Sequence, residues 1–441
     1  MEISGYRPRV IDERLNMYLR TFGAVCVEGP KWCGKTWTSR KHSASEFLVA
    51  SPAKNFQNRK LLEIDINAAF AGAAPHLIDE WQEFPELWDA TRAYVDESNE
   101  KGRYILTGSS TPKRKGVMHS GTGRIASLRM RPMTLWESGE SDGLVSFHDL
   151  CENRLGGVVR GRTPELKNIA EWIVRGGWPE SIGVPIRDAM SIPREYIKQV
   201  ENNDIHRIDE TRRDVHKVDL LLRSLARNEA TTASLSTLCN DIAEYDAGSV
   251  DPDTVSSYLN ALSRMFVTDN QKPFHANVRS KVRVKQSEKR HLCDPSIAAA
   301  LLKMTPEKVI GDIQYMGFLF ESLVERDLAV YAECMGAELM HYQDYLNREV
   351  DAVVEMEDGE WAAIEIKLGA RQEDAAAKGL VDLRDALAAE KFGKPPKALI
   401  VILGHSGAAY RRKDGVLVCP ISLLKALERV TRRPRCAREC R

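Results

Sequence analysis

The pattern of apolar and polar positions changes several times along the chain. Over roughly the first 140 residues, short apolar runs such as GAVCVEG (23–29) alternate with amphipathic stretches, which is typical of strands joined by helices in an α/β domain. The next stretch, about 145–210, is polar with helical character and breaks at GGWPE (176–180). Short helical patterns and an extended basic segment follow, and roughly the last 130 residues return to a mixed α/β pattern.

A helix-then-hairpin pattern occupies the middle of the chain. Apolar residues recur at helical spacing in 214–228 and again in 253–265, and the Asp-Pro pair at 251–252 is typical of a helix start. The segment RSKVRVK (279–285) then alternates with a period of two and places four cations on one face. This order of elements predicts a winged helix-turn-helix.

Contact with DNA is supported less strongly than this fold. The expected recognition helix, 253–265, has Arg264 as its only basic residue, so direct reading of guanine is poorly supported. The basic strand could contact phosphates, which gives affinity without sequence information. Lys and Arg also protect an edge strand from pairing with other chains, and the sequence leaves both interpretations open.

Composition narrows the class of protein. The chain has 441 residues, and a hydrophobic fraction of 43% excludes wholesale disorder. Lys+Arg and Asp+Glu both number 63, so a histone-like polycation is excluded and any nucleic-acid contact must come from local patches. One such patch is the tail 431–441, which holds five Arg against one Glu.

The distribution of apolar runs and cysteines predicts a cytoplasmic protein without membrane contact. No apolar run approaches the roughly 18 residues that a membrane span needs, and the N-terminus lacks the apolar stretch of a secretory signal. The nine cysteines are scattered, which fits reduced thiols better than a disulfide framework. Cys436 and Cys440 could provide two metal ligands, but no matching second pair is present.

A Gly-rich phosphate loop follows the strand expected at 23–29. The pattern GxxxxGK[ST] is matched by consecutive residues, namely Gly29, Pro30, Lys31, Trp32, Cys33, Gly34, Lys35 and Thr36. Backbone N–H groups of such a loop surround the β-phosphate, Lys35 reaches the β- and γ-phosphates, and the Thr36 hydroxyl binds Mg²⁺. The match predicts a nucleoside triphosphate site that uses Mg²⁺.

Two carboxylates end an apolar stretch about forty residues after this loop. Asp79, at the end of HLID (76–79), would hold Mg²⁺ through water, and Glu80 would orient or deprotonate the attacking water. The pair disfavours a small-molecule phosphotransferase, because a kinase needs no water-activating carboxylate at that place. An acidic start to a helix over 85–97 is the alternative interpretation.

A third strand, YILTGSS (104–110), ends in small hydroxyl residues. Thr107 and Ser109 could sense the γ-phosphate from the neighbouring strand of a parallel sheet, while an ordinary strand-to-loop turn is the alternative. The chain contains no NKxD-like reader of guanine, which favours ATP over GTP.

These motifs resemble those of a known family, the predicted AAA-type P-loop ATPases of bacteria and archaea that carry a C-terminal nuclease-like domain of uncharacterised role. The resemblance covers most of the chain and rests on GPKWCGKT, LIDEWQEFPELWDA (77–90), LTGSS (106–110), SGTGRIASLRMRPMTLWE (120–137), GGWPE and NDI (203–205). It implies a winged helix in the middle of the chain. Family members usually have GPR where this chain has GPK, so Lys31 keeps the charge but loses the planar fork of arginine.

The resemblance also assigns a role to Arg124 in the Gly-Arg step at 123–124. By resemblance, Arg124 is the charge-stabilising arginine of ATP hydrolysis, acting in cis or toward a neighbouring subunit. Because AAA-type cores often use a neighbour's arginine, a homo-oligomer is a reasonable expectation. The alternative is a surface arginine in a Gly-rich loop.

The C-terminal part contains two strand patterns that flank a Glu-Asp-Gly turn ending at Gly359. A three-residue loop with Gly359 in the left-handed conformation pairs residue 356 with residue 360. Asp351 then lies opposite Glu365, and Lys367 follows on the same face. A two-residue loop would change this register and separate the two carboxylates.

Two carboxylates on adjacent strands can hold Mg²⁺ or Mn²⁺ at a phosphodiester, and a nearby lysine can orient water or stabilise the charge. This D…ExK arrangement resembles the PD-(D/E)xK nuclease superfamily. By the same resemblance, Glu321 in the helix expected at 317–333 matches the acidic helix residue that accompanies the strands as a further metal ligand. The alternative is a solvated salt bridge on an exposed strand face.

The sequence therefore predicts an α/β protein with a parallel P-loop sheet, a helical and winged-helix middle, and a C-terminal mixed α/β restriction-endonuclease-like fold. The expected parts are a P-loop ATPase domain at 1–140, a helical AAA-associated region at 141–212, a winged-helix-like domain at 213–293, a nuclease-like domain at 294–430 and a basic tail at 431–441. The expected function is an ATPase that acts on, or is regulated by, nucleic acid, DNA in particular. The alternative is a nucleotide-switched DNA-binding regulator whose nuclease-like domain binds without cutting.

Overall fold

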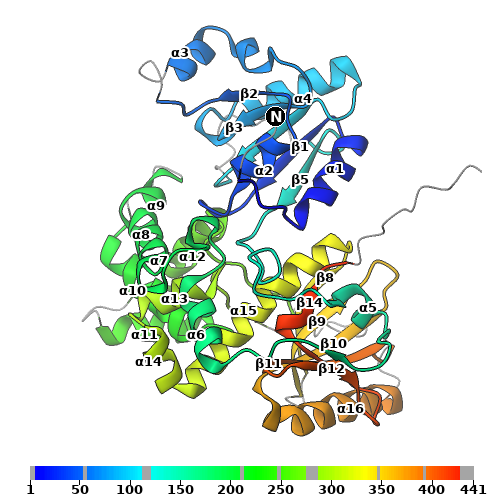
Figure 1. Ribbon diagram of the computed structural model, residues 1–441. Helices are drawn as coiled ribbons and strands as arrows, with labels where there is room; N and C mark the ends of the chain where they lie inside the picture. Colours follow the sequence, from blue (N-terminus) through cyan, green and yellow to red (C-terminus); the bar gives the residue numbers. More distant parts are fainter. Residues whose placement is uncertain are drawn as a thin grey trace, which may run out of the picture.

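The computed structural model describes residues 5–52, 57–111, 121–208, 213–245, 250–274, 287–344, 348–390 and 394–427. An N-terminal α/β body lies above a group of helices, and a C-terminal sheet lies beside those helices (Figure 1). The basic segment predicted at 279–285 and the tail at 431–441 lie outside the described residues, so their predictions are not tested. No helix within the described ranges is long and apolar enough to cross a membrane.

The N-terminal body is built on a parallel sheet with the strand order β2-β3-β4-β1-β5, which confirms the predicted parallel α/β fold. Its strands are β1 (Ala24–Glu28), β2 (Ser45–Leu48), β3 (His76–Asp79), β4 (Tyr104–Gly108) and β5 (Ile125–Arg129). Its helices are α1 (Ile11–Thr21), α2 (Lys35–Lys41), α3 (Gln57–Ile64) and α4 (Leu87–Ser98), with 3₁₀ turns η1 (Ile66–Phe70) and η2 (Trp81–Glu83).

The strands of this sheet are continuous apolar runs because both faces are covered. On one face Cys26, Ile78 and Leu106 pack with Leu87 of α4, and on the other face Val25 and its neighbours pack with α1. Strand β4 pairs with both β1 and β3, so the segment that follows β4 lies between the phosphate loop and the carboxylates.

The helical group lies below this sheet and is drawn in green in Figure 1. Its elements are α6 (Leu166–Arg175), η3 (Pro179–Ser181), α7 (Ile186–Ala189), α8 (Ser191–Gln199), the π-helical turn η4 (Val200–Asp204), α9 (Ile205–Arg207), α10 (Val215–Arg227), α11 (Leu235–Tyr245), α12 (Pro252–Arg264), α13 (Pro295–Leu301) and α14 (Pro306–Gly311). Helix α13 packs against α6 and α10, and α14 packs against α6. Helix α13, which follows the expected boundary at residue 294, therefore packs with this helical group, and the boundary itself stays a prediction.

Two extended segments follow α12, and we call them the wing segments: residues 267–274 and 287–293. Antiparallel bridges join Thr268 to Leu292 and Gln271 to Lys289, and a further bridge joins Thr231 to Arg290. Helices α10 to α12 therefore precede a pair of extended segments, and the winged-helix fold of this region stays a prediction.

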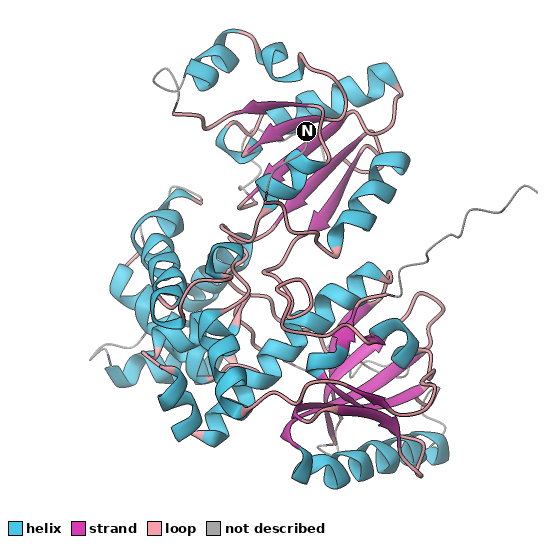
Figure 2. Ribbon diagram, in the orientation of Figure 1, coloured by secondary structure: helices cyan, strands magenta, loops and turns pink. Residues whose placement is uncertain are grey.

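The C-terminal body is a mixed sheet with the order β7-β12-β13-β11-β10-β9-β8, shown in magenta in Figure 2. Its strands are β7 (Val159–Arg160), β8 (Glu338–Gln343), β9 (Glu349–Glu355), β10 (Trp361–Gly369), β11 (Ala398–His405), β12 (Ala408–Arg411) and β13 (Leu417–Pro420). Helix α15 (Ile313–Cys334) packs with Ala352 and Ile364 on one side, and α16 (Glu373–Glu390) packs with Val353 and Val401 on the other.

Residues 145–160, which we expected in a helical region, contain short elements that pair and pack with this C-terminal body. Strand β6 (Val145–Ser146) pairs with β14 (Leu424–Lys425), β7 pairs with β12, and α5 (Phe147–Cys151) packs against β11 and α15. The cause is burial, because the apolar side chains of Phe147 and Leu150 lie in the core shared with α15. The division of the chain into domains stays a prediction.

Candidate functional site

The predicted phosphate loop connects β1 to α2. Gly29 is required here because a Cβ at this position would lie 2.0 Å from the carbonyl oxygen of Met130, and Gly34 has a left-handed φ of 104°. The Lys35 ammonium donates to the carbonyl oxygens of Gly29 at 3.0 Å and Pro30 at 2.8 Å. The lysine is thus folded over the loop that it is predicted to serve.

Asp79 joins this loop to the neighbouring strands. Its Oδ1 accepts hydrogen bonds from the Thr36 hydroxyl at 2.9 Å and from the Thr107 hydroxyl at 2.7 Å. Burial raises the pKa of Asp79 from its ordinary value, and the hydrogen bond from Thr107 partly offsets this effect. A half-buried carboxylate beside two hydroxyls is an oxygen-rich setting that suits Mg²⁺.

Glu80 is held by contacts from β4 and from the residues that follow it. Its backbone N–H donates to Thr107 Oγ1 at 2.9 Å, and its Oε2 accepts from the Ser109 hydroxyl at 3.0 Å and from the Gln82 amide. Its φ is 59°, a conformation that residues other than glycine adopt only where the surroundings hold it. The sequence predicted Thr107 and Ser109 at this place but missed Gln82, because a single amide two residues after Glu80 is no recognisable signal.

A cavity of about 680 Å³ adjoins the loop and is lined on its other side by the helical group. Its volume lies within the range of small-molecule sites. Lys35, Thr36 and Glu80 line one side, and Pro179 and Ile192 line the other. Residues of the GGWPE motif, to which the sequence assigned no contact with the nucleotide, therefore form a wall of the candidate nucleotide site.

Contacts beside the cavity connect the loop to its surroundings. Lys31 forms an ion pair of 2.7 Å with Asp204 of the NDI motif, and the Trp32 ring lies edge-on to Tyr196 at 5.8 Å. The buried Arg9 guanidinium donates to the Cys33 carbonyl oxygen at 2.7 Å. Lys31, which stands where family members usually have arginine, and Trp32 therefore face the helical group.

Arg124 lies at the opposite edge of the sheet. It directly precedes β5, its carbonyl oxygen accepts from the N–H of Ala24 at the start of β1, and its guanidinium forms an ion pair of 2.7 Å with Asp96. The phosphate loop follows the far end of β1, about 16 Å away at 3.3 Å per residue. The geometry does not support a role of Arg124 toward the loop of its own chain, and a role toward a neighbouring subunit stays a prediction.

The C-terminal hairpin has the predicted register. Gly359 is left-handed with a φ of 76°, the N–H of Met356 donates to the Glu360 carbonyl oxygen, and Trp361 pairs with Glu355. The ladder between β9 and β10 ends one step earlier than expected, at the pair Ala352 and Ile364.

Beyond this pair, the side chain of Asp351, rather than the backbone of β9, accepts the hydrogen bond from β10. Its Oδ2 accepts from the N–H of Ile366 at 2.7 Å and from the Lys367 ammonium at 2.8 Å. Lys367 also pairs with Glu365 at 2.6 Å. The D…ExK side chains therefore form one cluster where the two strands diverge.

Burial and charge perturb this cluster. Burial, together with the charge of Asp351, raises the pKa of Glu365 to about 7. Burial works to lower the pKa of Lys367, but Asp351 and Glu365 raise it above its ordinary value. Burial and Asp351 also raise the pKa of Glu321 to about 8, against the opposing charge of Lys289.

Two residues near Glu321 were missed from the sequence. Lys289 of the wing pairs with Glu321 and, at 2.7 Å, with Glu325 on the next turn of α15. Within the described part of the chain, no group of three or more His, Cys, Asp and Glu side chains is spaced to hold a metal ion. The metal role of Glu321, Asp351 and Glu365 stays a prediction.

Three family models match separate parts of the chain. The model described as an AAA domain matches residues 21–138, which contain the phosphate loop, Asp79 and Glu80. This part of the chain is an AAA-type ATPase domain. Two further models follow this ATPase domain, each described as a domain of unknown function, and they match residues 166–308 (DUF8612) and 316–424 (DUF4143).

Two mycobacterial proteins are similar to the chain over more than its AAA-type ATPase domain. Uncharacterized protein Rv2008c of Mycobacterium tuberculosis and uncharacterized protein Mb2031c of Mycobacterium bovis are each 24% identical over 347 residues, which cover 78% of this chain and 70% of the relative. Among solved structures, the chain is similar to the Walker-type ATPase PABY2304 of Pyrococcus abyssi, with 14% identity, a TM-score of 0.40, and coverage of 66% of this chain and 94% of the other. It is also similar to AMPPCP-bound DnaA of Aquifex aeolicus, with 13% identity, a TM-score of 0.26, and coverage of 58% and 86%.

Proposed function

We propose that the protein is a Mg²⁺-dependent ATPase that acts on, or is regulated by, nucleic acid, DNA in particular, and that its C-terminal body is nuclease-like. The observation that carries the ATPase part is the set of hydrogen bonds by which Thr36 and Thr107 converge on Asp79 beside the 680 Å³ cavity. The match of residues 21–138 to an AAA domain supports the same conclusion.

The residues at this site divide the work of hydrolysis. The loop amides and Lys35 would hold the β- and γ-phosphates, and Thr36 with Asp79 would hold Mg²⁺, whose charge stabilises the transferred phosphoryl group. The donors fit this ion, because a hydroxyl and a half-buried carboxylate provide only oxygen ligands. Ser109 and Gln82 aim one oxygen of Glu80, which leaves the other to orient the attacking water and accept its proton.

The nucleic-acid part of the proposal is supported by the middle and C-terminal bodies. Helices α10 to α12 followed by the wing segments have the order of a winged helix-turn-helix. Asp351, Glu365 and Lys367 cluster where β9 and β10 diverge, as a D…ExK site would require. Divalent cations and a phosphodiester are the ligands that this chemistry would take.

A second candidate is a nucleotide-switched regulator that binds DNA without cutting it. The observation that favours it is the pairing of the same carboxylates with ammonium groups, because Lys367 neutralises Asp351 and Glu365 while Lys289 neutralises Glu321. In this candidate the C-terminal body contributes binding surface rather than cleavage.

One paired assay separates the two candidates and tests both. Wild type, Lys35→Ala and Asp351→Ala are assayed for ATP turnover and for nicking of plasmid DNA with Mg²⁺ or Mn²⁺. We expect Lys35→Ala to abolish ATP turnover and Asp351→Ala to leave it largely intact while removing any nicking. If wild type turns over ATP but never nicks plasmid or single strands, the regulator is the correct function. If wild type turns over no ATP, the proposal is wrong.

A further inference from the structure

The side chain of Lys289 crosses from the wing into the carboxylates of the C-terminal body. Its ammonium donates to Glu325 Oε1 at 2.7 Å, to the carboxylate of Glu321, and to the backbone carbonyl oxygen of Asp351 at 3.0 Å. Only 7% of the side chain is exposed. A lysine is rarely buried to this extent unless it is paired, so the contact is specific.

Oxygen donors from two elements converge on this ammonium. Oxygen atoms from two carboxylates and one carbonyl surround it, which are the donors that a divalent cation also prefers. Asp351 contacts Lys289 through its backbone carbonyl, while its carboxylate lies where β9 and β10 diverge. Lys289 thus occupies the side of the D…ExK cluster that faces α15.

We propose that Lys289 is an intramolecular plug of the nuclease-like site, and that a divalent cation binds there only when residues 287–293 withdraw. The inference rests on the metal role proposed above for Asp351, Glu365 and Glu321. The described arrangement is then a closed state, in which the Lys289 ammonium supplies the positive charge. In an open state the metal would supply it.

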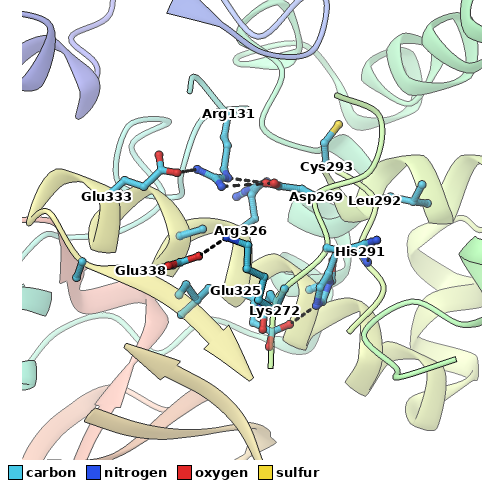
Figure 3. Close-up of a pocket in the computed structure, with 16 residues that line it drawn as sticks. Arg131, Asp269, Lys272, His291, Leu292, Cys293, Glu325, Arg326, Glu333 and Glu338 are labelled. Carbon is cyan, nitrogen blue, oxygen red and sulfur yellow. Dashed lines mark hydrogen bonds and ion pairs between the residues drawn. The ribbon is translucent and has the colours of Figure 1, made fainter. Parts of the chain in front are cut away.

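The wing segments also contact the ATPase domain, so a change in that domain can reach Lys289 through direct contacts. Arg131, two residues beyond the end of β5, pairs with Asp269 of the first wing segment at 2.5 Å and with Glu333 of α15 at 2.8 Å. Figure 3 shows Arg131 reaching both carboxylates at one end of a cavity of about 240 Å³.

The other end of this cavity lies near Lys289. There His291, two residues after Lys289, pairs with Glu325 at 3.0 Å (Figure 3). On the ATPase side, the N–H of Met130 donates to the carbonyl oxygen of Glu28, the residue directly before the phosphate loop. A movement of the loop therefore has a short path of direct contacts to the wing.

Binding of Mn²⁺ in the absence of nucleotide tests the plug without relying on enzyme activity. All proteins carry Asp79→Asn, so that the ATPase site contributes no cation binding. The test variant is Lys289→Met, which keeps the length of the side chain but removes its charge. The matched control is Lys272→Met, because Lys272 lies in the other wing segment and forms an exposed pair with Glu338. Free Mn²⁺ is measured by electron paramagnetic resonance.

We expect Lys289→Met to bind Mn²⁺ about tenfold more tightly or better than the parent protein, because the competing ammonium no longer limits the binding-competent population. Lys272→Met should match the parent, and adding Asp351→Asn to Lys289→Met should remove the gain. Mn²⁺ should also raise the melting temperature of Lys289→Met more than that of the parent, since a ligand stabilises the state that binds it.

A second variant protects the test against misfolding of Lys289→Met. Asp269→Asn leaves every carboxylate of the site intact but removes the ion pair that anchors the wing to Arg131. It should also bind Mn²⁺ more tightly than the parent, by a smaller factor. One result would show a cation site without a plug. In that case the Mn²⁺ affinity would be equal in the parent, in Asp269→Asn and in every folded Lys289 variant, and Asp351→Asn would abolish the binding. No Mn²⁺ binding in any protein would overturn both the plug and the proposed metal site, while ATP binding by protein with an intact Asp79 tests the ATPase site separately.

Discussion

Thr36 and Asp79 share a hydrogen bond of 2.9 Å although 43 positions separate them along the chain. The contact is possible because β1 and β3 run parallel with β4 between them, so the segments that follow these strands meet at one edge of the sheet. The same edge receives Thr107 and Ser109 from β4. The phosphate loop and the acidic pair are therefore parts of one site, which bears directly on how the ATPase domain should respond to mutation.

Asp79→Asn tests the proposed metal contact. The amide can still accept the hydrogen bonds of Thr36 and Thr107, but it removes the negative charge that would attract Mg²⁺. We expect ATP turnover to fall by about 100-fold or more, in line with the loss of a charged group at a phosphoryl-transfer site. Glu63→Gln, an exposed charge removal on α3, is the control and should retain turnover. Normal turnover by Asp79→Asn, measured as phosphate release, would contradict the assignment.

Glu80→Gln should trap bound ATP. The amide oxygen can still accept the hydrogen bond of the Ser109 hydroxyl, and the backbone N–H can still donate to Thr107 Oγ1. The amide cannot, however, accept a proton from water. We expect ATP affinity close to that of wild type in calorimetry, with turnover lowered by two or more orders of magnitude. Glu86→Gln at the start of α4 changes an exposed carboxylate and is the matched control. Hydrolysis at the wild-type rate by Glu80→Gln would remove Glu80 from the mechanism.

Much of this site could be predicted from the sequence because its signals are local. The phosphate loop needs consecutive residues with fixed spacing, and the hairpin register follows from a turn whose glycine must be left-handed. The contacts of Lys289 and the wall formed by Pro179 depend on bodies that are distant in the sequence. No spacing rule encodes such contacts.

Long-range packing also decides which body contains residues 145–160 and helix α13. Both segments have buried apolar side chains, but the sequence alone does not say which neighbours bury them. Which body buries them is decided by long-range packing, as the pairing of β7 with β12 shows. Arg124 illustrates the opposite case, since its motif was recognised while its position at the far edge of the sheet could not be derived from the motif alone.

Arg124 leads to a prediction about assembly. Because it lies far from the loop of its own chain, it can stabilise charge on ATP only at the site of a neighbouring copy. Arg124→Ala should then lower turnover without changing ATP affinity. Mixing Arg124→Ala with Lys35→Ala should restore part of the activity, because one protein supplies an intact loop and the other an intact arginine. Turnover per chain that is independent of protein concentration, together with no gain on mixing, would exclude this role.

Glu365 gives the C-terminal body a defined dependence on pH. Its pKa in the folded protein is raised to about 7, chiefly by burial, so the folded state holds its proton over a range in which the unfolded chain has released it. Stability from this group is therefore present below the ordinary pKa near 4.5 and is lost as pH rises toward 7. The size of the loss is on the order of 3 kcal/mol, from 1.36 kcal/mol for each unit of the pKa shift. Glu365→Gln should reduce this fall in the free energy of unfolding, measured by urea unfolding between pH 5 and 7.5. Glu360→Gln, which changes the partner of Lys394, is the control and should leave the fall unchanged. A fall of the same slope in Glu365→Gln would place the titrating group elsewhere.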